Sequence, residues 1–176
     1  MIMPRGQQLL LPASPLFIWS TLTVAVLVNM FLNMGLIGRE AWMPDVLALV
    51  LLFWSIHQPL RVGMGAAFAL GLAMDVHQSA LLGQHALAYT ALSFLAIGIH
   101  RRLLWFSVPS QAAQVLPLLV ASHALSLTVR LLAGGDFPGW SMVLAPALEA
   151  LLWPVMSVLL LLPQRRAPDP DANRPL

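Results

Sequence analysis

Long apolar stretches separated by short polar segments dominate this sequence. A helix that crosses a bilayer needs about 20 mostly apolar residues, because each residue advances the helix by about 1.5 Å. Stretches that approach this length lie at residues 16–35, 44–56, 62–80, 81–99, 111–132 and 140–162. The pattern therefore predicts an all-α membrane protein, a polytopic bundle of about six transmembrane helices.

Two features of the pattern leave the number of spans open. The stretch at 44–56 is short for a span and needs polar neighbours at either end to lengthen it. Between the third and fourth stretches, Gly83 and a few polar residues are the turn signals: His77, Gln78, Gln84 and His85. Five spans with one re-entrant segment at this point are the alternative to six.

The composition favours contact with lipid. Of the 176 residues, 59% are hydrophobic and 9% are charged, whereas a soluble domain carries about 25% charged residues. So few charges cannot cover the surface of a soluble fold of this size. The chain has no cysteine, so disulfides and thiolate metal sites are excluded. The net charge is only +2, and we expect no nucleic-acid partner.

The arginines predict how the chain threads the bilayer, since cytoplasmic loops carry an excess of Lys and Arg. Six spans place both termini on one side. If that side is the cytoplasm, the inner arginines are Arg5, Arg61, Arg101, Arg102, Arg165, Arg166 and Arg174, against Arg39 and Arg130 outside. We therefore expect a cytoplasmic segment at 1–14, a transmembrane domain at 15–163 and a disordered cytoplasmic tail at 164–176.

Ionisable side chains within the spans are the candidates for chemistry, because each costs about 2.5–3.5 kcal/mol to insert. They are Asp45, Asp75, His123, Arg130 and Glu149. The rise per residue places Asp75, His123 and Glu149 in one layer, at or just outside the midplane. The layer is either a proton or ligand site or a set of interhelical hydrogen bonds, and we favour the hydrogen bonds. Asp45 and Arg130 lie near the outer face, and we hypothesise that they pair.

Small residues recur every four positions in the third stretch. Gly63, Ala67 and Gly71 form one stripe, which Asp75 continues. A parallel stripe consists of Gly65, Ala69 and Ala73. Small side chains let another helix approach closely. That helix belongs either to the bundle, which we favour, or to a partner protein.

Pro44 and Asp45 are typical of the start of a helix. Proline at the first helical position loses no needed hydrogen bond, and an acidic residue in the first turn meets the positive end of the helix dipole. This pair needs no further function to explain it.

The sequence contains no motif of a familiar enzyme class. HExxH, GxSxG, the Walker loop and the glycine-rich dinucleotide turn are all absent. The histidines at the predicted turn, His77 and His85, have no carboxylate beside them in sequence and make a poor metal site. Ser157 and His123 could form a dyad, but nothing supplies an oxyanion hole. We therefore expect no catalytic, cofactor or metal site.

A central part of the chain resembles a known family. The run Pro44-Asp45-Val-Leu-Ala-Leu-Val, followed by Trp54 and Arg61-Val-Gly, resembles the rod shape-determining protein MreD family. The runs at 67–76 and 82–89 resemble it too, and length, span number and arginine-bearing tail agree. The matching positions that we regard as structural or interaction candidates are Pro44, Asp45, Gly71, Asp75, Gly83 and Gln84.

This resemblance implies a function and a set of partners. Such proteins are non-catalytic scaffolds of the elongation complex in the bacterial inner membrane, where they bind MreC and help to organise peptidoglycan synthesis. MreC has a single membrane helix and a periplasmic region. The wider complex includes MreB, RodA and a class B penicillin-binding transpeptidase. The resemblance also implies a fold similar to the S components of vitamin transporters, so a small-molecule-binding or transport subunit is the alternative.

Overall fold

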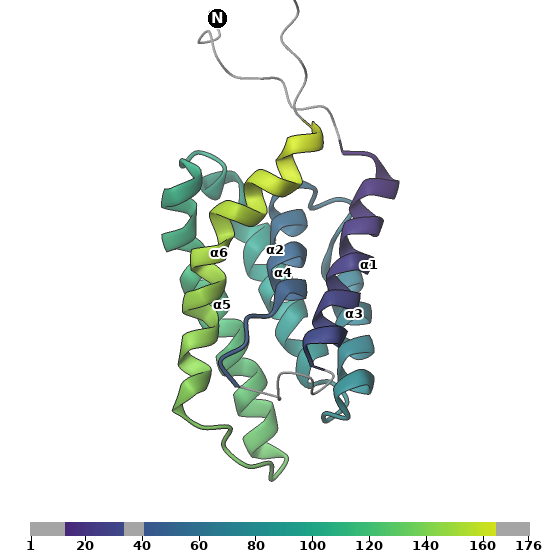
Figure 1. The fold of residues 1–176 in the computed structure, drawn as a ribbon, viewed down its shortest axis with the longest axis vertical. Coiled ribbons are helices and arrows are strands. Elements are labelled where there is room, and N and C mark those ends of the chain that lie inside the picture. The colour runs from purple at the N-terminus through teal and green to yellow at the C-terminus, as the bar shows by residue number, and fades with distance from the viewer. Residues whose placement is uncertain (1–12, 34–40, 165–176) are drawn as a thin grey trace, which may run out of the picture.

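The computed structural model describes residues 13–33 and 41–164, and this part of the chain folds into a bundle of helices (Figure 1). The six α-helices are α1 (Pro15–Leu32), α2 (Val46–His57), α3 (Met64–Gln78), α4 (Gln84–Leu103), α5 (Val108–Leu132) and α6 (Leu144–Leu161). Short 3₁₀ helices, η1 (Trp140–Val143) and η2 (Leu162–Gln164), flank α6. The all-α bundle predicted from the apolar stretches is confirmed.

The turn between α3 and α4 separates two complete helices. Ser79 and Gly83 both have positive φ, at 50° and 105°, which ends α3 and starts α4 within a few residues. Glycine adopts this conformation without a steric penalty. The third and fourth apolar stretches are therefore distinct helices that pack against one another.

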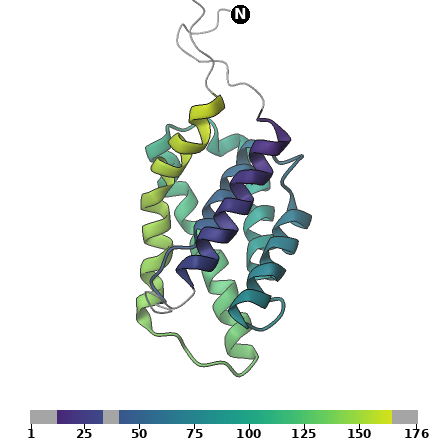
Figure 2. The same cartoon turned by 45° about the vertical axis from the view of Figure 1, so that its right-hand side comes forward.

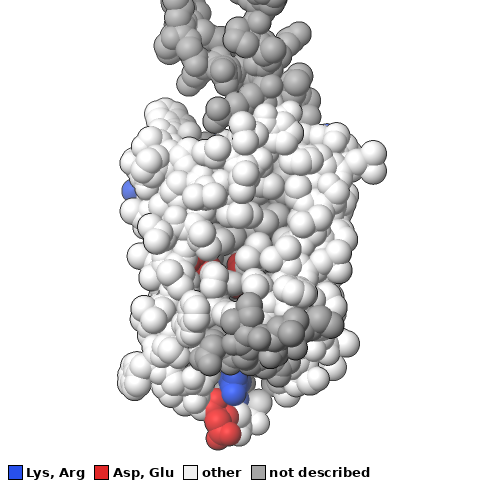
Figure 3. Space-filling view, viewed as in Figure 1, with Lys and Arg blue, Asp and Glu red and all other residues white. Residues whose placement is uncertain are grey.

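Within the described residues, three helical segments are long and apolar enough to cross a membrane. They are Pro15–Leu32, Val108–Leu132 and Trp140–Gln164. The outer surface agrees with lipid contact, since Figure 3 shows a face that is almost free of charged side chains. Large apolar side chains of α1 are exposed there or on adjoining faces: Leu16, Trp19, Leu27 and Phe31. The crossing of all six helices stays a prediction.

Helix α2 forms the centre of the bundle. It has 12 residues, and every residue from Leu47 to Ile56 is buried. Helices α1, α4 and α6 pack around it (Figures 1 and 2). A helix that is apolar on all sides is expected to be enclosed by protein or lipid. The stretch that is short for a span is thus the core helix.

The start of α2 lies inside the bundle instead of at its end. Figure 1 shows a non-helical segment that runs from the lower end of the bundle up to the first turn of α2. The described part of that segment is Ala41–Asp45, and it is not helical. Away from water, such backbone must find hydrogen-bond partners in the protein. The partners form the candidate site below.

The two small-residue stripes of α3 have different surroundings. Ala67, Gly71 and Asp75 are buried, and a Cβ at Gly71 would lie 2.6 Å from the backbone nitrogen of Ala86 in α4. The first stripe is therefore an internal contact. The hypothesis that a partner's helix binds to it is wrong, because α4 covers Gly71. The second stripe, Gly65, Ala69 and Ala73, is exposed.

The first residue of α1 and the last residue of α6 lie at the same end of the bundle (Figure 1). Arg61 is also there, and its Nη1 donates to the carbonyl oxygen of Ala13 at 2.6 Å. Arg101 and Arg102 end α4 at this end, whereas Arg130 ends α5 at the other. The predicted charge asymmetry thus holds among the described arginines. Arg5, Arg39, Arg165, Arg166 and Arg174, with the segments at 1–12 and 165–176, lie outside the described residues.

Replacement of Gly71 by alanine is expected to lower the free energy of unfolding by about 1–3 kcal/mol, because the added methyl overlaps the backbone of α4. Chemical unfolding in detergent measures the difference. Gly65→Ala is the matched control, since nothing lies within 4 Å of a Cβ there, and helix propensity alone favours alanine by about 1 kcal/mol. Equal stability changes in the two variants would contradict the close contact between α3 and α4.

Candidate functional site

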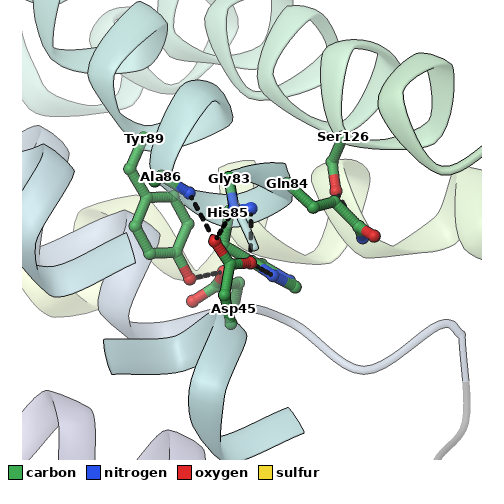
Figure 4. A network of polar contacts seen from close by, with 8 residues as sticks. Asp45, Gly83, Gln84, His85, Ala86, Tyr89 and Ser126 are labelled. Carbon is green, nitrogen blue, oxygen red and sulfur yellow. Dashed lines mark hydrogen bonds and ion pairs between the residues drawn. The ribbon is translucent and has the colours of Figure 1, made fainter. Parts of the chain in front are cut away.

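Backbone N–H groups at the start of α4 donate hydrogen bonds to the carboxylate of Asp75 in α3. Asp75 is fully buried, and its Oδ2 accepts from the backbone nitrogens of Gly83 at 2.8 Å and Ala86 at 3.3 Å. Its Oδ1 accepts from the backbone nitrogen of His85 at 2.8 Å (Figure 4). The first N–H groups of a helix have no partner within the helix and carry its positive dipole end. Asp75 therefore acts as an N-terminal cap supplied by another helix.

Asp75 also contacts the ring of His85, with Oδ1 and Nδ1 2.8 Å apart. The expectation that no carboxylate stands beside the histidines of the turn is therefore wrong in space, because the reversal of the chain brings α3 against the start of α4. Gln84 turns to the other side and donates from Nε2 to Oγ of Ser126 at 3.0 Å. Within the described residues, no group of three or more potential ligands is placed to hold a metal ion.

The start of α2 is held in the same way by a second group of residues. Asp45 is the N-cap, and its Oδ1 accepts from the backbone nitrogen of Ala48 and from Nδ2 of Asn29, both at 2.9 Å. The hydroxyl of Tyr89 donates to Oδ2 (Figure 4). The backbone nitrogen of Asp45 donates to Oε1 of Glu149 at 2.8 Å. Helices α1, α4 and α6 thus converge on the first turn of α2.

Pro44 and Asp45 do mark the start of this helix, but both lie earlier than expected. Asp45 is the N-cap and not a residue of the first turn, Pro44 precedes the cap, and Val46 is the first helical residue. Proline has no N–H to donate. Its position in the non-helical segment therefore removes one donor that the bundle interior would otherwise have to satisfy.

His123 of α5 joins this group through Glu149. Nε2 of His123 lies 2.9 Å from Oε1 of Glu149, and Glu149 is fully buried. Of the predicted layer, the structure therefore joins His123 and Glu149 directly. Asp75 caps α4 instead. It is linked to the same group of residues by His85, whose ring contacts both Asp75 and the ring of Tyr89. These contacts are interhelical hydrogen bonds, which is the interpretation favoured from the sequence.

The structure does not pair Asp45 with Arg130. The carboxylate of Asp45 takes its partners from α1, α2 and α4, and no ion pair with an arginine occurs among the residues described. Arg130 lines the same cavity as Asp45. The proposed pairing is therefore wrong, although both residues face one space.

A cavity lies beside this cluster. An outer part of about 200 Å³ is lined by polar residues that include Asn29, Gln84 and Arg130. An inner chamber of about 50 Å³ is lined by Tyr89 and Glu149. Both are lined by Asp45, His85, His123 and Ser126, so they adjoin. Figure 3 shows acidic atoms inside the molecule through an opening part-way up this face.

Sequence reasoning missed Asn29 and Tyr89. Asn29 is a lone amide in an otherwise apolar part of α1, and it is 3% exposed. That isolation was a usable signal, because a buried amide needs partners. Tyr89 is the single tyrosine of the chain, but nothing in the sequence indicates that its hydroxyl reaches Asp45.

Comparison with known proteins gives the family. The sequence model described as rod shape-determining protein MreD matches residues 13–162. The chain belongs to the MreD family. It is also 28% identical over 124 residues to the rod shape-determining protein MreD of Haemophilus influenzae. This alignment covers 70% of the present chain and 76% of the Haemophilus protein. No solved structure matches the chain, so the likeness to S components stays a prediction.

Membership in the MreD family fixes the broad function. The chain is a membrane protein with a role in the determination of cell shape. The matched segment includes all six α-helices of the described structure and the residues of the polar cluster. The family is one of structural, shape-determining proteins, and it is not a known enzyme family.

Replacement of Asp75 by asparagine is expected to lower the free energy of unfolding by about 1–3 kcal/mol. The amide NH₂ would face N–H donors at the start of α4, and the negative charge at the dipole end would be lost. Thermal or chemical unfolding in detergent measures the effect. Asp136→Asn changes the same group at an exposed site and should shift stability by less than about 0.5 kcal/mol. A loss no larger in Asp75→Asn would show that the cap contributes little.

Proposed function

We propose that this protein is a non-catalytic scaffold of the cell-elongation complex in the bacterial inner membrane, which binds MreC and helps to organise peptidoglycan synthesis. The observation that carries the proposal is the family match over residues 13–162, which takes in the whole bundle. In the wider complex, the partners are MreB, RodA and a class B penicillin-binding transpeptidase.

The polar interior supports a structural role for the ionisable residues. Asp75 and Asp45 each accept hydrogen bonds at every carboxylate oxygen, and both cap helices. The ring of His123 is held by Glu149, so it is not paired with Ser157. These side chains fix which helices pack together, which is what a scaffold requires of its interior.

The orientation follows from the arginines. We place the end of the bundle that carries Arg61, Arg101 and Arg102 at the cytoplasmic face, with both termini on that side. Arg130 and the mouth of the cavity then face the periplasm.

The exposed stripe of α3 is our proposed contact for the single membrane helix of MreC. Gly65, Ala69 and Ala73 lie on the outside, and nothing in the bundle lies within 4 Å of a Cβ built at Gly65. In lipid there is no hydrophobic driving force between apolar helices. Close backbone contact across small residues is therefore a main source of association. The bundle uses the other stripe of α3 for its own α3–α4 contact.

Ala69→Leu is expected to reduce the amount of MreC that co-purifies from membranes several-fold, because leucine would separate the two helices. Ala121→Leu is the matched control, an exposed alanine on α5. Expression and unfolding of both variants should equal those of the unaltered protein. If Ala69→Leu recovers as much MreC as the unaltered protein, the proposal that α3 contacts MreC is wrong. Failure of the unaltered protein to recover MreC would contradict the scaffold itself.

A further inference from the structure

Two residues that line the cavity each carry a polar group with no partner among the described residues. One is Glu149, whose Oε2 is buried and accepts no hydrogen bond. The other is Arg130, for whose guanidinium the structure gives no hydrogen bond or ion pair in its described part. Arg130 lines the outer part of the cavity and Glu149 the inner chamber.

The other carboxylates of the cluster show how unusual Glu149 is. Every oxygen of Asp45 and Asp75 accepts at least one hydrogen bond. Oε1 of Glu149 lies within hydrogen-bonding distance of two nitrogens, the backbone nitrogen of Asp45 and Nε2 of His123. A buried acceptor without a donor destabilises the fold, and more so when it is charged. A donor brought into the inner chamber would recover that cost.

The inner chamber is small. Its volume is about 50 Å³, and a cavity needs roughly 10–15 Å³ of such space to hold a water molecule. A primary ammonium group is of similar size and offers three donors. A quaternary ammonium group is larger and offers none. The chamber therefore favours a primary amine, and the outer 200 Å³ leaves room for the rest of a small ligand.

Arg130 sets the chemistry of the other end. It lies seven residues after His123 on α5, about 10 Å along the helix. An arginine side chain covers much of this distance, so a short molecule can touch both groups. A guanidinium prefers a carboxylate or a phosphate, which it binds through two parallel hydrogen bonds.

We propose that the cavity binds a small zwitterion, with a primary ammonium group on Oε2 of Glu149 and an acidic group on Arg130. The ligand is either a free molecule or the headgroup of an ethanolamine lipid, since the two present the same chemistry. This site lies apart from the outer stripe of α3, so it goes beyond the scaffold role and does not depend on it.

Thermal unfolding of the full-length protein in detergent tests the proposal, with O-phosphoethanolamine and β-alanine as probes and O-phosphocholine as the quaternary comparison. A ligand that binds the folded state raises the melting temperature, and the rise grows with the ratio of free ligand concentration to Kd. We expect at least one primary-amine probe to raise it and phosphocholine not to do so. Arg130→Gln and Glu149→Gln should each need at least tenfold more probe for the same shift.

Arg102→Gln is the matched control, an exposed arginine at the opposite end of the bundle, and should respond like the unaltered protein. Glu149→Gln also disturbs the start of α2, so it could fail to fold. Arg130→Gln keeps the test valid in that case, because the guanidinium of Arg130 makes no hydrogen bond within the described residues.

Lipid nanodiscs separate the two sources of the ligand. Stabilisation by phosphatidylethanolamine over phosphatidylcholine, lost in Arg130→Gln, with no effect of the free probes, would assign the site to a lipid headgroup. Stabilisation by a free probe would assign it to a soluble zwitterion. Equal effects of phosphocholine, an unchanged response in Arg130→Gln, or no response to any probe or lipid would overturn the proposal.

Discussion

The structure depends on one constraint: the first N–H groups of α2, which begins inside the bundle, and of α4, which begins against the buried Asp75, need acceptors from the protein. Water supplies acceptors at the surface of a soluble protein, but hydrocarbon and packed side chains cannot. The chain supplies carboxylates instead. Asp75 accepts hydrogen bonds from the backbone N–H groups at the start of α4, while Asp45 and Glu149 accept them at the start of α2. Each carboxylate lies at the positive end of a helix dipole, which offsets part of the cost of its burial.

This constraint also determines which helices are neighbours. The cap of α4 comes from α3, and the cap of α2 is completed by α1, α4 and α6 through Asn29, Tyr89 and Glu149. His123 adds α5 to the group. All six helices therefore meet around two N-termini. Apolar packing has little directional preference, whereas these hydrogen bonds need their donors and acceptors in specific positions, so they help to fix which membrane helices pack together.

The sequence predicts much of the fold but little of this cluster. Apolar stretches define the helices because each must be apolar over most of its length, and Pro44 and Asp45 mark the start of α2. Pairs such as Tyr89 with Asp45 are 44 residues apart, and no local pattern encodes them. The helical rise placed His123 and Glu149 at a similar depth in the bundle, and the structure brings their side chains into contact. It could not show that Asp75 bonds to the start of α4 instead, since that depends on the turn at Gly83.

Helix α3 connects the interior to the outer surface. On its inner side, Gly71 rests on the backbone of α4 beside Ala86, whose N–H is also capped by Asp75. On its outer side, Gly65, Ala69 and Ala73 are exposed. A helix bound outside and a ligand beside His85 would therefore act on opposite sides of one α3–α4 contact. Gly71 leaves no room for α3 to shift toward α4. A displacement of α3 would therefore either slide it along α4 or rotate the two helices together. A slide would change the hydrogen bonds between Asp75 and the start of α4.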